Sequence, residues 1–480
     1  MDVNITPLLP AAQLLVTALV VMLRDLFIKE HEPKPILVLL SLVGMGLAAS
    51  ECLALWGLQE RAFNDSVVLD NFALFFTLIF ILAGALTILS SIDYVRPAGI
   101  HEGEFYTLVL FATVGMALMA AANDLMVFFL GLETMSVAVY VLTGMWRSES
   151  RSSEAAMKYF VMGAFATGFL LYGIALIYGA TGSTNLNLIS EYLAGQPGEW
   201  PAYLIGGGFL LLIGFAFKVG AAPFHFWVPD VYEGAPTPVT GFMSVAVKAA
   251  AFAAWGRILL HKLSALDSDW LFPLWTIAIA TMTIGNLLAI TQSSVKRMLA
   301  YSSIAHAGYL LIAVVVGAEW GGLPLLFYVL TYSFMTIGAF AVLSCLAEEN
   351  NRREDYKDFS GLGFKRPFLA LAMALFMLSL AGFPPLAGFT GKFYVFRAAV
   401  LSGHIGLAII AVLNSLLSVV YYLRVIVAMY MEEGGADGKS FREAAAVYVA
   451  IALAVAGTLY LGILPATALD WSRIAFASLE

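Results

Sequence analysis

Long apolar runs, separated by short polar segments, follow one another along almost the whole chain. A helix needs about 20 mostly apolar residues to cross a bilayer. The pattern therefore predicts an all-α polytopic membrane protein with about fourteen transmembrane helices. The expected spans are centred on residues 7–23, 35–57, 71–92, 105–122, 124–146, 157–180, 203–227, 239–260, 270–290, 297–316, 322–346, 367–401, 405–430 and 443–465.

Two of the expected spans are interrupted by proline. The seventh runs into Pro223, and the twelfth, which is too long for one straight crossing, contains Pro384 and Pro385. Proline lacks a backbone N–H and breaks or kinks a helix, and in lipid the freed backbone groups need protein or water as partners. We therefore expect broken seventh and twelfth helices.

The spacing of the two breaks indicates an internal repeat. They lie five spans apart, and a repeat with an odd number of crossings places consecutive copies in opposite orientations. Spans four to eight and nine to thirteen would then form two inverted five-helix repeats, in which Lys218 and Lys392 occupy related positions beside the breaks. The resulting division is a three-helix region (1–104), a first repeat (105–262), a second inverted repeat (263–432) and a C-terminal helix (433–480).

Basic residues gather in the loops that follow odd-numbered spans, for example Arg96, Arg147 and Lys296, whereas the other loops hold little beyond Arg61 and Lys262. By the positive-inside rule the first set of loops faces the cytoplasm. We therefore expect a multi-pass protein of a bacterial inner membrane, with both termini on the non-cytoplasmic side. The loops leave no room for a soluble catalytic domain, so redox or hydrolytic chemistry would belong to partners.

Composition narrows the functional classes further. Of 480 residues, 61% are hydrophobic and 12% are charged, against about 45–50% and about 25% in soluble domains. The net charge of −8 provides no basic field for nucleic acid. Cys52 and Cys345 lie in apolar runs, away from any CxxC, and no GxGxxG or GxxxxGK[ST] motif occurs. No metal or nucleotide site is therefore expected in this chain.

Five ionisable residues lie near the middle of expected spans: Glu133, Lys218, Lys248, His306 and Lys392. A charge at mid-bilayer costs about 2.5–3.5 kcal/mol on insertion scales and usually serves a function. We interpret the set as a proton path along the membrane plane, since histidine titrates near neutral pH and suits a relay. The alternatives are a structural ion pair for Glu133 and hydrogen-bonded packing for His306.

Four further residues are accessory relay candidates. Glu154 and Lys158 share one helix face at the start of the sixth span, where an interfacial ion pair is the simpler interpretation. Tyr332 and Thr336 share a face of the eleventh span. This polar face is compatible with a file of water molecules and also with ordinary interhelical hydrogen bonding. Arg257, near a span end, is interpreted as an interfacial anchor.

Three long motifs carry a resemblance to a known family: KVGAAPFHFWVPDVYEGAPTPVTGF, TQSSVKRMLAYSSIAHAGYLL and LAGFPPLAGFTGKFYVF. Over nearly its whole length the chain resembles the antiporter-like subunits of respiratory complex I, a NADH-quinone oxidoreductase, and most of all subunit N (mitochondrial subunit 2). Lys392 stands where subunit M has a glutamate, and the chain ends soon after its fourteenth span, whereas subunit L continues into a long lateral helix.

The resemblance implies that Glu133 pairs with Lys218, that Lys248 is the central relay and that Lys392 closes the path, while His306 matches the family's histidine. It implies that no cofactor is bound by this chain. NADH, FMN, iron–sulfur clusters and quinone would belong to the assembled complex. The implied partners are lipid, a neighbouring antiporter-like subunit and the small membrane subunits.

Three other functions are compatible with parts of the pattern. A subunit of a multi-subunit cation/proton antiporter or of a membrane-bound hydrogenase shares the fold and several motifs. A stand-alone secondary transporter would need a substrate pocket, which a row of lysines spread along the membrane does not favour. A passive membrane anchor would leave five buried ionisable residues unexplained.

Overall fold

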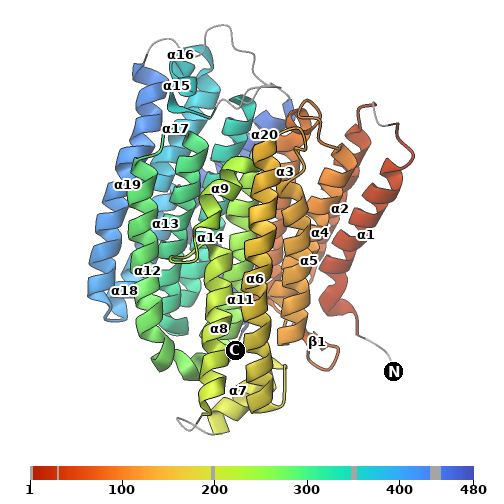
Figure 1. Ribbon diagram of the computed structural model, residues 1–480, viewed down its shortest axis with the longest axis vertical. Coiled ribbons are helices and arrows are strands. Elements are labelled where there is room, and N and C mark those ends of the chain that lie inside the picture. The colour runs from red at the N-terminus through yellow and green to blue at the C-terminus, as the bar shows by residue number, and fades with distance from the viewer. Residues whose placement is uncertain (1–3, 30–31, 196–199, 347–353, 433–444, 480) are drawn as a thin grey trace.

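The computed structural model describes residues 4–29, 32–195, 200–346, 354–432 and 445–479, which form one bundle of near-parallel helices (Figure 1). In these ranges thirteen helical segments are long and apolar enough to cross a membrane. They are α1 (Leu9–Asp25), α2 (Pro35–Ala54), α3 (Asn71–Val95), α4 (Glu102–Ala121), α5 (Leu125–Thr143), α6 (Ser150–Thr181), α8 (Ala202–Val219), the segment Thr237–Lys262, α12 (Asp267–Ile290), α13 (Val295–Val315), α14 (Gly317–Leu346), α19 (Ile405–Met431) and α20 (Ala445–Ile463).

The shorter apolar helix α17 (Pro367–Ala381) and the helix that follows it, α18 (Ala387–Leu401), supply the remaining crossing. The predicted all-α fold with fourteen crossings is therefore confirmed. Residues 433–444, which include the start of the expected fourteenth span, lie outside the described ranges.

Both predicted helix breaks are present. Helix α8 ends at Val219, where Gly220 adopts a φ of +72°, and the chain resumes as α9 (Trp227–Gly234). Helix α17 ends at Ala381, where Gly382 adopts a φ of +94°. A positive φ costs glycine nothing and allows the chain to leave the helix abruptly.

The backbone at the first break has protein partners. The N–H of Ala222 donates to Oγ1 of Thr281 at 2.9 Å, and the carbonyl of Phe217 accepts from Nε1 of Trp227 at 3.1 Å. These contacts satisfy the requirement that non-helical backbone at membrane depth be buried in protein.

The central crossing Thr237–Lys262 is irregular. It consists of α10 (Thr237–Phe242), the π-helical turn η2 (Met243–Val247), α11 (Lys248–Trp255) and a second π-helical turn, η3 (Gly256–Lys262). Its apolar part is wholly buried inside the bundle. π-helical turns are rare and occur frequently at functional sites, and here one immediately precedes Lys248.

Short elements missing from the sequence prediction lie outside the long helices. They are η1 (Thr6–Leu8), the antiparallel pair β1 (Glu60–Ala62) and β2 (Val67–Leu69), α7 (Leu186–Gly195), η4 (Ser264–Leu266), α15 (Tyr356–Phe359), α16 (Leu362–Lys365) and α21 (Ala466–Ala477). Near the N-terminus Asn4 donates to Glu60 at 3.0 Å, and near the C-terminus Ser478 accepts from the N–H of Phe72 at 3.1 Å. Both terminal regions lie at the same end of the bundle (Figure 1).

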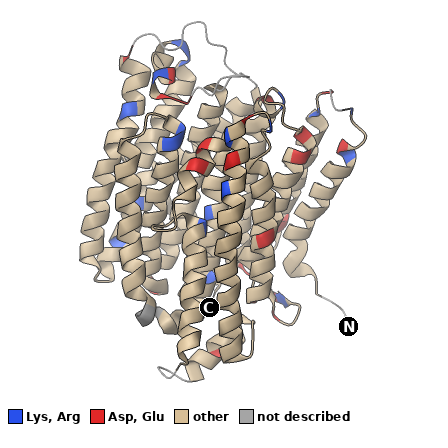
Figure 2. Cartoon of the chain, viewed as in Figure 1, with Lys and Arg blue, Asp and Glu red and all other residues tan. Residues whose placement is uncertain are grey.

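The outer helices expose apolar side chains, as lipid contact requires, for example Val16, Phe165 and Leu416. Most charged positions gather toward the opposite end from the chain termini, and several lie inside the bundle (Figure 2). Arg257 was predicted as an interfacial anchor, and this was wrong. Its side chain is buried and pairs with Asp70 at 2.8 Å, a partner far away in the sequence.

Candidate functional site

Glu133 lies near the middle of α5 and is half-buried. Its Oε1 atom accepts a hydrogen bond from Oγ1 of Thr167 on α6 at 3.1 Å. The partner comes from a neighbouring helix, as expected for a carboxylate with no basic residue within one turn, but it is a hydroxyl group.

Lys218 occupies the last turn of α8, directly before the first break, and is only 2% exposed. Its ammonium group donates to Oγ of Ser136 at 2.7 Å and to the hydroxyl of Tyr140 at 3.3 Å. Both acceptors belong to α5, one and two turns beyond Glu133. Among the described residues no ion pair within 4.0 Å joins Glu133 to Lys218, so the implied pairing is not formed in this structure.

Lys248 begins α11 and is buried. Its Nζ atom donates to the carbonyl of Ser303 at 2.6 Å and to Oγ of Ser303 at 2.9 Å, and lies 6.0 Å from the ring centre of Tyr232. These acceptors are neutral. Because an amine also donates through its N–H groups, the same oxygens can hold Lys248 with or without its extra proton.

His306 lies in the middle of α13 and uses both ring nitrogens. Nδ1 is 2.7 Å from the hydroxyl of Tyr328, and Nε2 is 3.0 Å from the hydroxyl of Tyr422, which also bonds to Ser302. A neutral imidazole donates at one nitrogen and accepts at the other, and a tyrosine hydroxyl does both. The arrangement can therefore pass a proton from one side of the ring to the other.

Lys392 lies in α18, after the second break, and is 3% exposed. Its ammonium donates to the carbonyls of Leu380 and Ala381 at 2.9 and 3.1 Å and to Oγ of Ser415 at 2.9 Å. The two carbonyls end α17, where a cation is stabilised by the helix dipole. Nζ also lies 5.0 Å from the ring centre of Tyr309.

Helix α13 connects three of these groups. Ser303 contacts Lys248, His306 follows one turn later, and Tyr309 lies against Lys392 one turn later again. The YSSIAHAGY motif thus brings Lys248, His306 and Lys392 to one helix. Within the described residues no hydrogen bond joins the acceptors of Lys218 to those of Lys248.

Lys218 and Lys392 differ in their positions relative to the helix breaks. Lys218 belongs to the half-helix before its break, whereas Lys392 belongs to the half-helix after its break. Their correspondence between the repeats stays a prediction.

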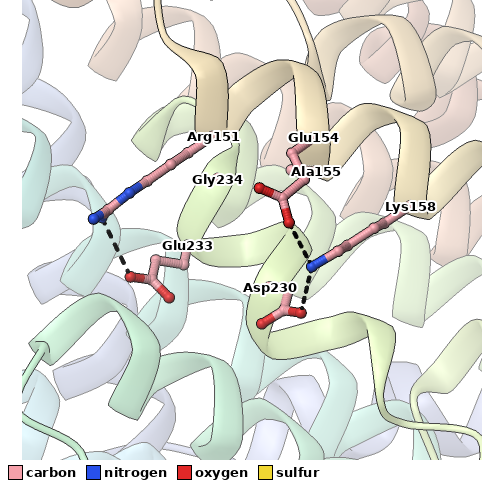
Figure 3. Close-up of a pocket in the computed structure, with 7 residues that line it drawn as sticks. All are labelled: Arg151, Glu154, Ala155, Lys158, Asp230, Glu233 and Gly234. Carbon is pink, nitrogen blue, oxygen red and sulfur yellow. Dashed lines mark hydrogen bonds and ion pairs between the residues drawn. The ribbon is translucent and has the colours of Figure 1, made fainter.

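The four accessory relay candidates lie in two separate parts of the structure. Tyr332 lies against His306, with ring centres 5.0 Å apart, and Thr336 is buried one turn further along α14. Lys158 pairs with Glu154 at 2.7 Å, as the i,i+4 spacing predicts, and also with Asp230 on α9 at 3.0 Å (Figure 3).

Sequence reasoning missed the neutral acceptors and Asp230. Ser136 and Tyr140 follow Glu133 at helical spacing, so the polar face of α5 was readable in the sequence. Asp230 stands in the quoted PFHFWVPD motif. Its ion pairs link segments 67 and 72 residues apart, and no local pattern reveals such contacts.

No three His, Cys, Asp or Glu side chains in the described ranges lie together as metal ligands would. Cys52 and Cys345 are buried free thiols.

Comparison with known proteins gives consistent matches. The family described as "NADH:quinone oxidoreductase/Mrp antiporter, TM" matches residues 122–418. The NADH-quinone oxidoreductase subunit N of Trichlorobacter lovleyi is 50% identical over 473 residues, covering 98% of this chain and 97% of the relative. The subunit N of Chloroflexus aggregans is 46% identical over 467 residues, covering 97% and 95%.

Solved structures resemble the fold over the same extent. A chain of respiratory complex I from Thermus thermophilus with bound aureothin has a TM-score of 0.81 at 37% identity, covering 96% of this chain and 98% of that one. A chain of the archaeal membrane-bound sulfane sulfur reductase has a TM-score of 0.87 at 25% identity, covering 98% and 97%.

Proposed function

We propose that this chain, which belongs to the NADH:quinone oxidoreductase/Mrp antiporter family, is the proton-translocating membrane subunit N of a NADH-quinone oxidoreductase. Within the family it belongs to the subunit N group. It acts as part of a translocase and carries no redox centre. NADH, FMN, iron–sulfur clusters and quinone bind to partner subunits, and the other membrane subunits of the complex flank it in the membrane.

One observation supports this function above the others: ionisable groups are buried in succession on different helices, each within hydrogen-bonding distance of neutral oxygens. The proposed relay runs through Glu133, Lys218, Lys248, His306 and Lys392. Glu154, Lys158, Tyr332 and Thr336 are its accessory groups, and the breaks at Pro223, Pro384 and Pro385 supply non-helical backbone beside the two outer lysines.

The chemistry of the relay follows from the groups themselves. The amine of Lys248 can take a proton while its bonds to Ser303 remain. His306 can receive a proton on one nitrogen and release another from the opposite nitrogen toward Tyr328 or Tyr422. In the charged state Lys392 is stabilised by the carbonyls that end α17.

The initial trigger lies at Glu133 and Lys218. In this structure they bind hydroxyl groups on α6 and α5 instead of each other. A charge change in a neighbouring subunit would bring the carboxylate and the ammonium together or separate them. That movement would change the electrostatic surroundings of Lys218, since Coulomb interactions are strong in a low-dielectric interior.

The proposed topology places the protein in a bacterial inner membrane with both termini on the non-cytoplasmic side. The functional division follows the breaks: 1–104, the repeats 105–262 and 263–432, and 433–480. A subunit of a cation/proton antiporter or of a membrane-bound hydrogenase is the alternative, and the names of the two relatives given above favour the oxidoreductase.

The test is Lys248→Ala in the assembled complex, in inverted membrane vesicles. We expect the proton-transfer step through this chain to slow by about a hundredfold or more, since that is the typical loss when a positioned proton-transfer group is removed. Proton pumping per NADH oxidised should therefore fall. Lys357→Ala, at an exposed side chain, is the control. Unchanged pumping in a fully assembled Lys248→Ala complex would contradict the relay.

A further inference from the structure

A charged pocket of about 170 Å³ opens between α6 and α9. Arg151, Glu154 and Lys158 line one side, and Asp230 and Glu233 line the other (Figure 3). The side chains of Lys158 and Asp230 are 41% and 39% exposed, so water reaches them. Helix α6 begins just after the loop that carries Arg147, which the charge pattern assigns to the cytoplasm.

A stack of three aromatic rings joins the two helices that line this pocket, α6 and α9, to α8. Tyr159 follows Lys158 on α6, and Trp227 lies one turn before Asp230 on α9. Their rings are parallel, with centres 4.5 Å apart and an interplanar angle of 8°. Trp227 also stacks on Phe217 of α8 at 5.2 Å and 28°. All three residues are at most 4% exposed.

Lys218 lies on the inner side of the stack. It is the next residue after Phe217, and its ammonium donates to the hydroxyl of Tyr140. The ring of Tyr140 packs edge-on against Tyr159, with centres 4.7 Å apart. The stack therefore connects α6 and α9, which line the charged pocket, with the turn of α8 that carries Lys218.

The hydroxyl of Tyr159 and the indole N–H of Trp227 are the hydrogen-bonding groups on the three rings of this stack. Protons move along chains of hydrogen-bonding groups or water, and ring faces provide neither. The indole N–H of Trp227 is already committed to the carbonyl of Phe217 at 3.1 Å. A proton that crosses the stack toward Lys218 therefore requires the Trp227 ring to move.

We propose that Tyr159, Trp227 and Phe217 form an aromatic gate that closes the charged pocket against Lys218, and that the pocket is the place where protons are taken up into the first repeat. The proposal rests on the proposed relay function and adds its uptake side. Because Trp227 is the first residue of α9, a shift of this short helix opens the gate.

The charges of the pocket hold α9 in place. Asp230 pairs with Lys158 at 3.0 Å and with Arg297 of α13 at 3.0 Å. Glu233 pairs with Arg151 at 3.6 Å and also with Arg297. Although burial alone would raise the pKa of the Asp230 carboxyl, the hydrogen bonds from Lys158 and Arg297 hold it below its usual value. A shift of α9 therefore has to separate ion pairs in which Asp230 keeps its charge.

The first experiment measures passive proton leak. Inverted vesicles containing the assembled complex receive an acid pulse without NADH, and the decay of the pH gradient is followed. We expect Trp227→Ala to raise the leak rate through the complex about tenfold, because a closed site is what prevents proton leakage. Adding Lys218→Ala should remove most of this leak, since the leak must pass through Lys218.

Two variants serve as controls. Trp255→Ala removes an equally buried indole that stacks on Phe215 and Phe252, away from the pocket, and should leave the leak unchanged. Trp227→Phe keeps a ring in the stack and should stay closed. Tyr159→Ala removes the α6 side of the gate and should leak like Trp227→Ala, so the test stands even if one opening variant fails to assemble.

The second experiment detects water directly. A cysteine in place of Ser136, beside Lys218, should react with a charged, membrane-impermeant methanethiosulfonate reagent added to inverted vesicles when Trp227 is alanine. It should resist the reagent when Trp227 is present. The native Cys52 and Cys345 are buried, and the parent protein measures their background.

The outcomes separate the gate from the relay. Loss of pumping in Lys248→Ala, with no leak and no labelling in either opening variant, overturns the gate and leaves the relay standing. Full pumping in Lys248→Ala overturns the relay whatever the leak shows. A leak that is equal in Trp227→Ala and Trp255→Ala also overturns the gate, because it would report a general loss of packing.

Discussion

At the scale of single residues, the three lysines of the proposed relay bind neutral oxygens instead of carboxylates. Lys248 bonds to Ser303, and Lys392 bonds to backbone carbonyls and Ser415. The sequence predicted these lysines from their depth in apolar spans. Their acceptors come from other helices, 55 and 23 residues away for the two serines, so spacing along the chain could not reveal them.

Arg257 behaves differently, because it has a buried counter-charge. It contacts Asp70 through two nitrogens at 2.8 Å and donates to the carbonyl of Ala120 at 2.9 Å. We predict that Asp70→Asn lowers the free energy of unfolding by about 3–5 kcal/mol, since removing one partner leaves the other charge buried and unpaired. The asparagine can still accept the N–H of Ala73 that caps α3, so the loss reports the charge. Thermal denaturation of the purified complex measures it.

Arg61→Gln is the matched control for that variant. Arg61 pairs with Asp65 at 3.5 Å with both side chains at least half exposed. Exposed pairs contribute about 0–1 kcal/mol, so the midpoint of denaturation should hardly move. A similar loss in both variants would show that burial does not set the strength of the Arg257 pair.

At the scale of elements, the sequence predicted the two helix breaks. It did not predict which side chains form hydrogen bonds with the backbone at the breaks. Pro223, Pro384 and Pro385 mark where a helix must stop. At the first break the N–H of Ala222 bonds to the hydroxyl of Thr281, and at the second the carbonyl of Ala381 bonds to the ammonium of Lys392. Both side chains belong to other helices. The π-helical turns η2 and η3 had no signal in the hydrophobic pattern, because that pattern predicts a single uninterrupted crossing over residues 239–260.

The second break yields a prediction at Gly382. A Cβ atom at this position would lie 3.2 Å from Cδ of Lys392, and the backbone has a φ of +94°. We expect Gly382→Ala to cost about 1–2 kcal/mol from the left-handed backbone alone. Because the end of α17 holds Lys392, proton pumping should fall as well. Vesicle pumping and thermal denaturation of the same preparation test both effects.

Gly406→Ala provides the comparison. Gly406 lies in α19 with an ordinary backbone and no atom within 4 Å of an added Cβ. Alanine favours the helix here by roughly 0.5–1 kcal/mol, so stability should rise slightly and pumping should persist. Equal losses at Gly382 and Gly406 would argue against the special role of the break.

At the scale of the whole molecule, Lys296 ties the two halves together. It is buried at the start of α13 and donates to the carbonyls of Glu233 and Ala235, at the end of α9, at 3.2 and 2.8 Å. It also pairs with Glu354 at 3.0 Å, just before α15. The half-helix of the first break is thereby fixed to two segments of the second half.

Replacing Lys296 should loosen this connection. We predict that Lys296→Met lowers the free energy of unfolding by about 3 kcal/mol or more, because Glu354 keeps its charge in a buried place without this partner. Proton pumping should decline with it. Lys357→Met, at a side chain that is 80% exposed, should change neither quantity. Pumping and stability at parent levels in Lys296→Met would show that the halves are joined by other contacts.

The global architecture followed from the sequence because span length and hydropathy are set by the bilayer alone. Fourteen crossings and the positions of both breaks were read from apolar runs and prolines. The β1–β2 pair, α7 and α21 were missed, since such short elements form against the ends of the long helices and lack a long periodic pattern. Arg257 was misjudged because its partner, Asp70, comes from another crossing.

The placement of the buried groups has an electrical consequence. Glu133, Lys248 and His306 each lie near the middle of a crossing helix, so a proton passing among them moves mainly parallel to the membrane surface. The membrane potential acts along the perpendicular direction, at about 2.3 kcal/mol per elementary charge for 100 mV. The lateral steps would therefore run almost independently of voltage. The electrical work of pumping falls on the steps that take the proton into the bundle past Trp227 and release it on the opposite side.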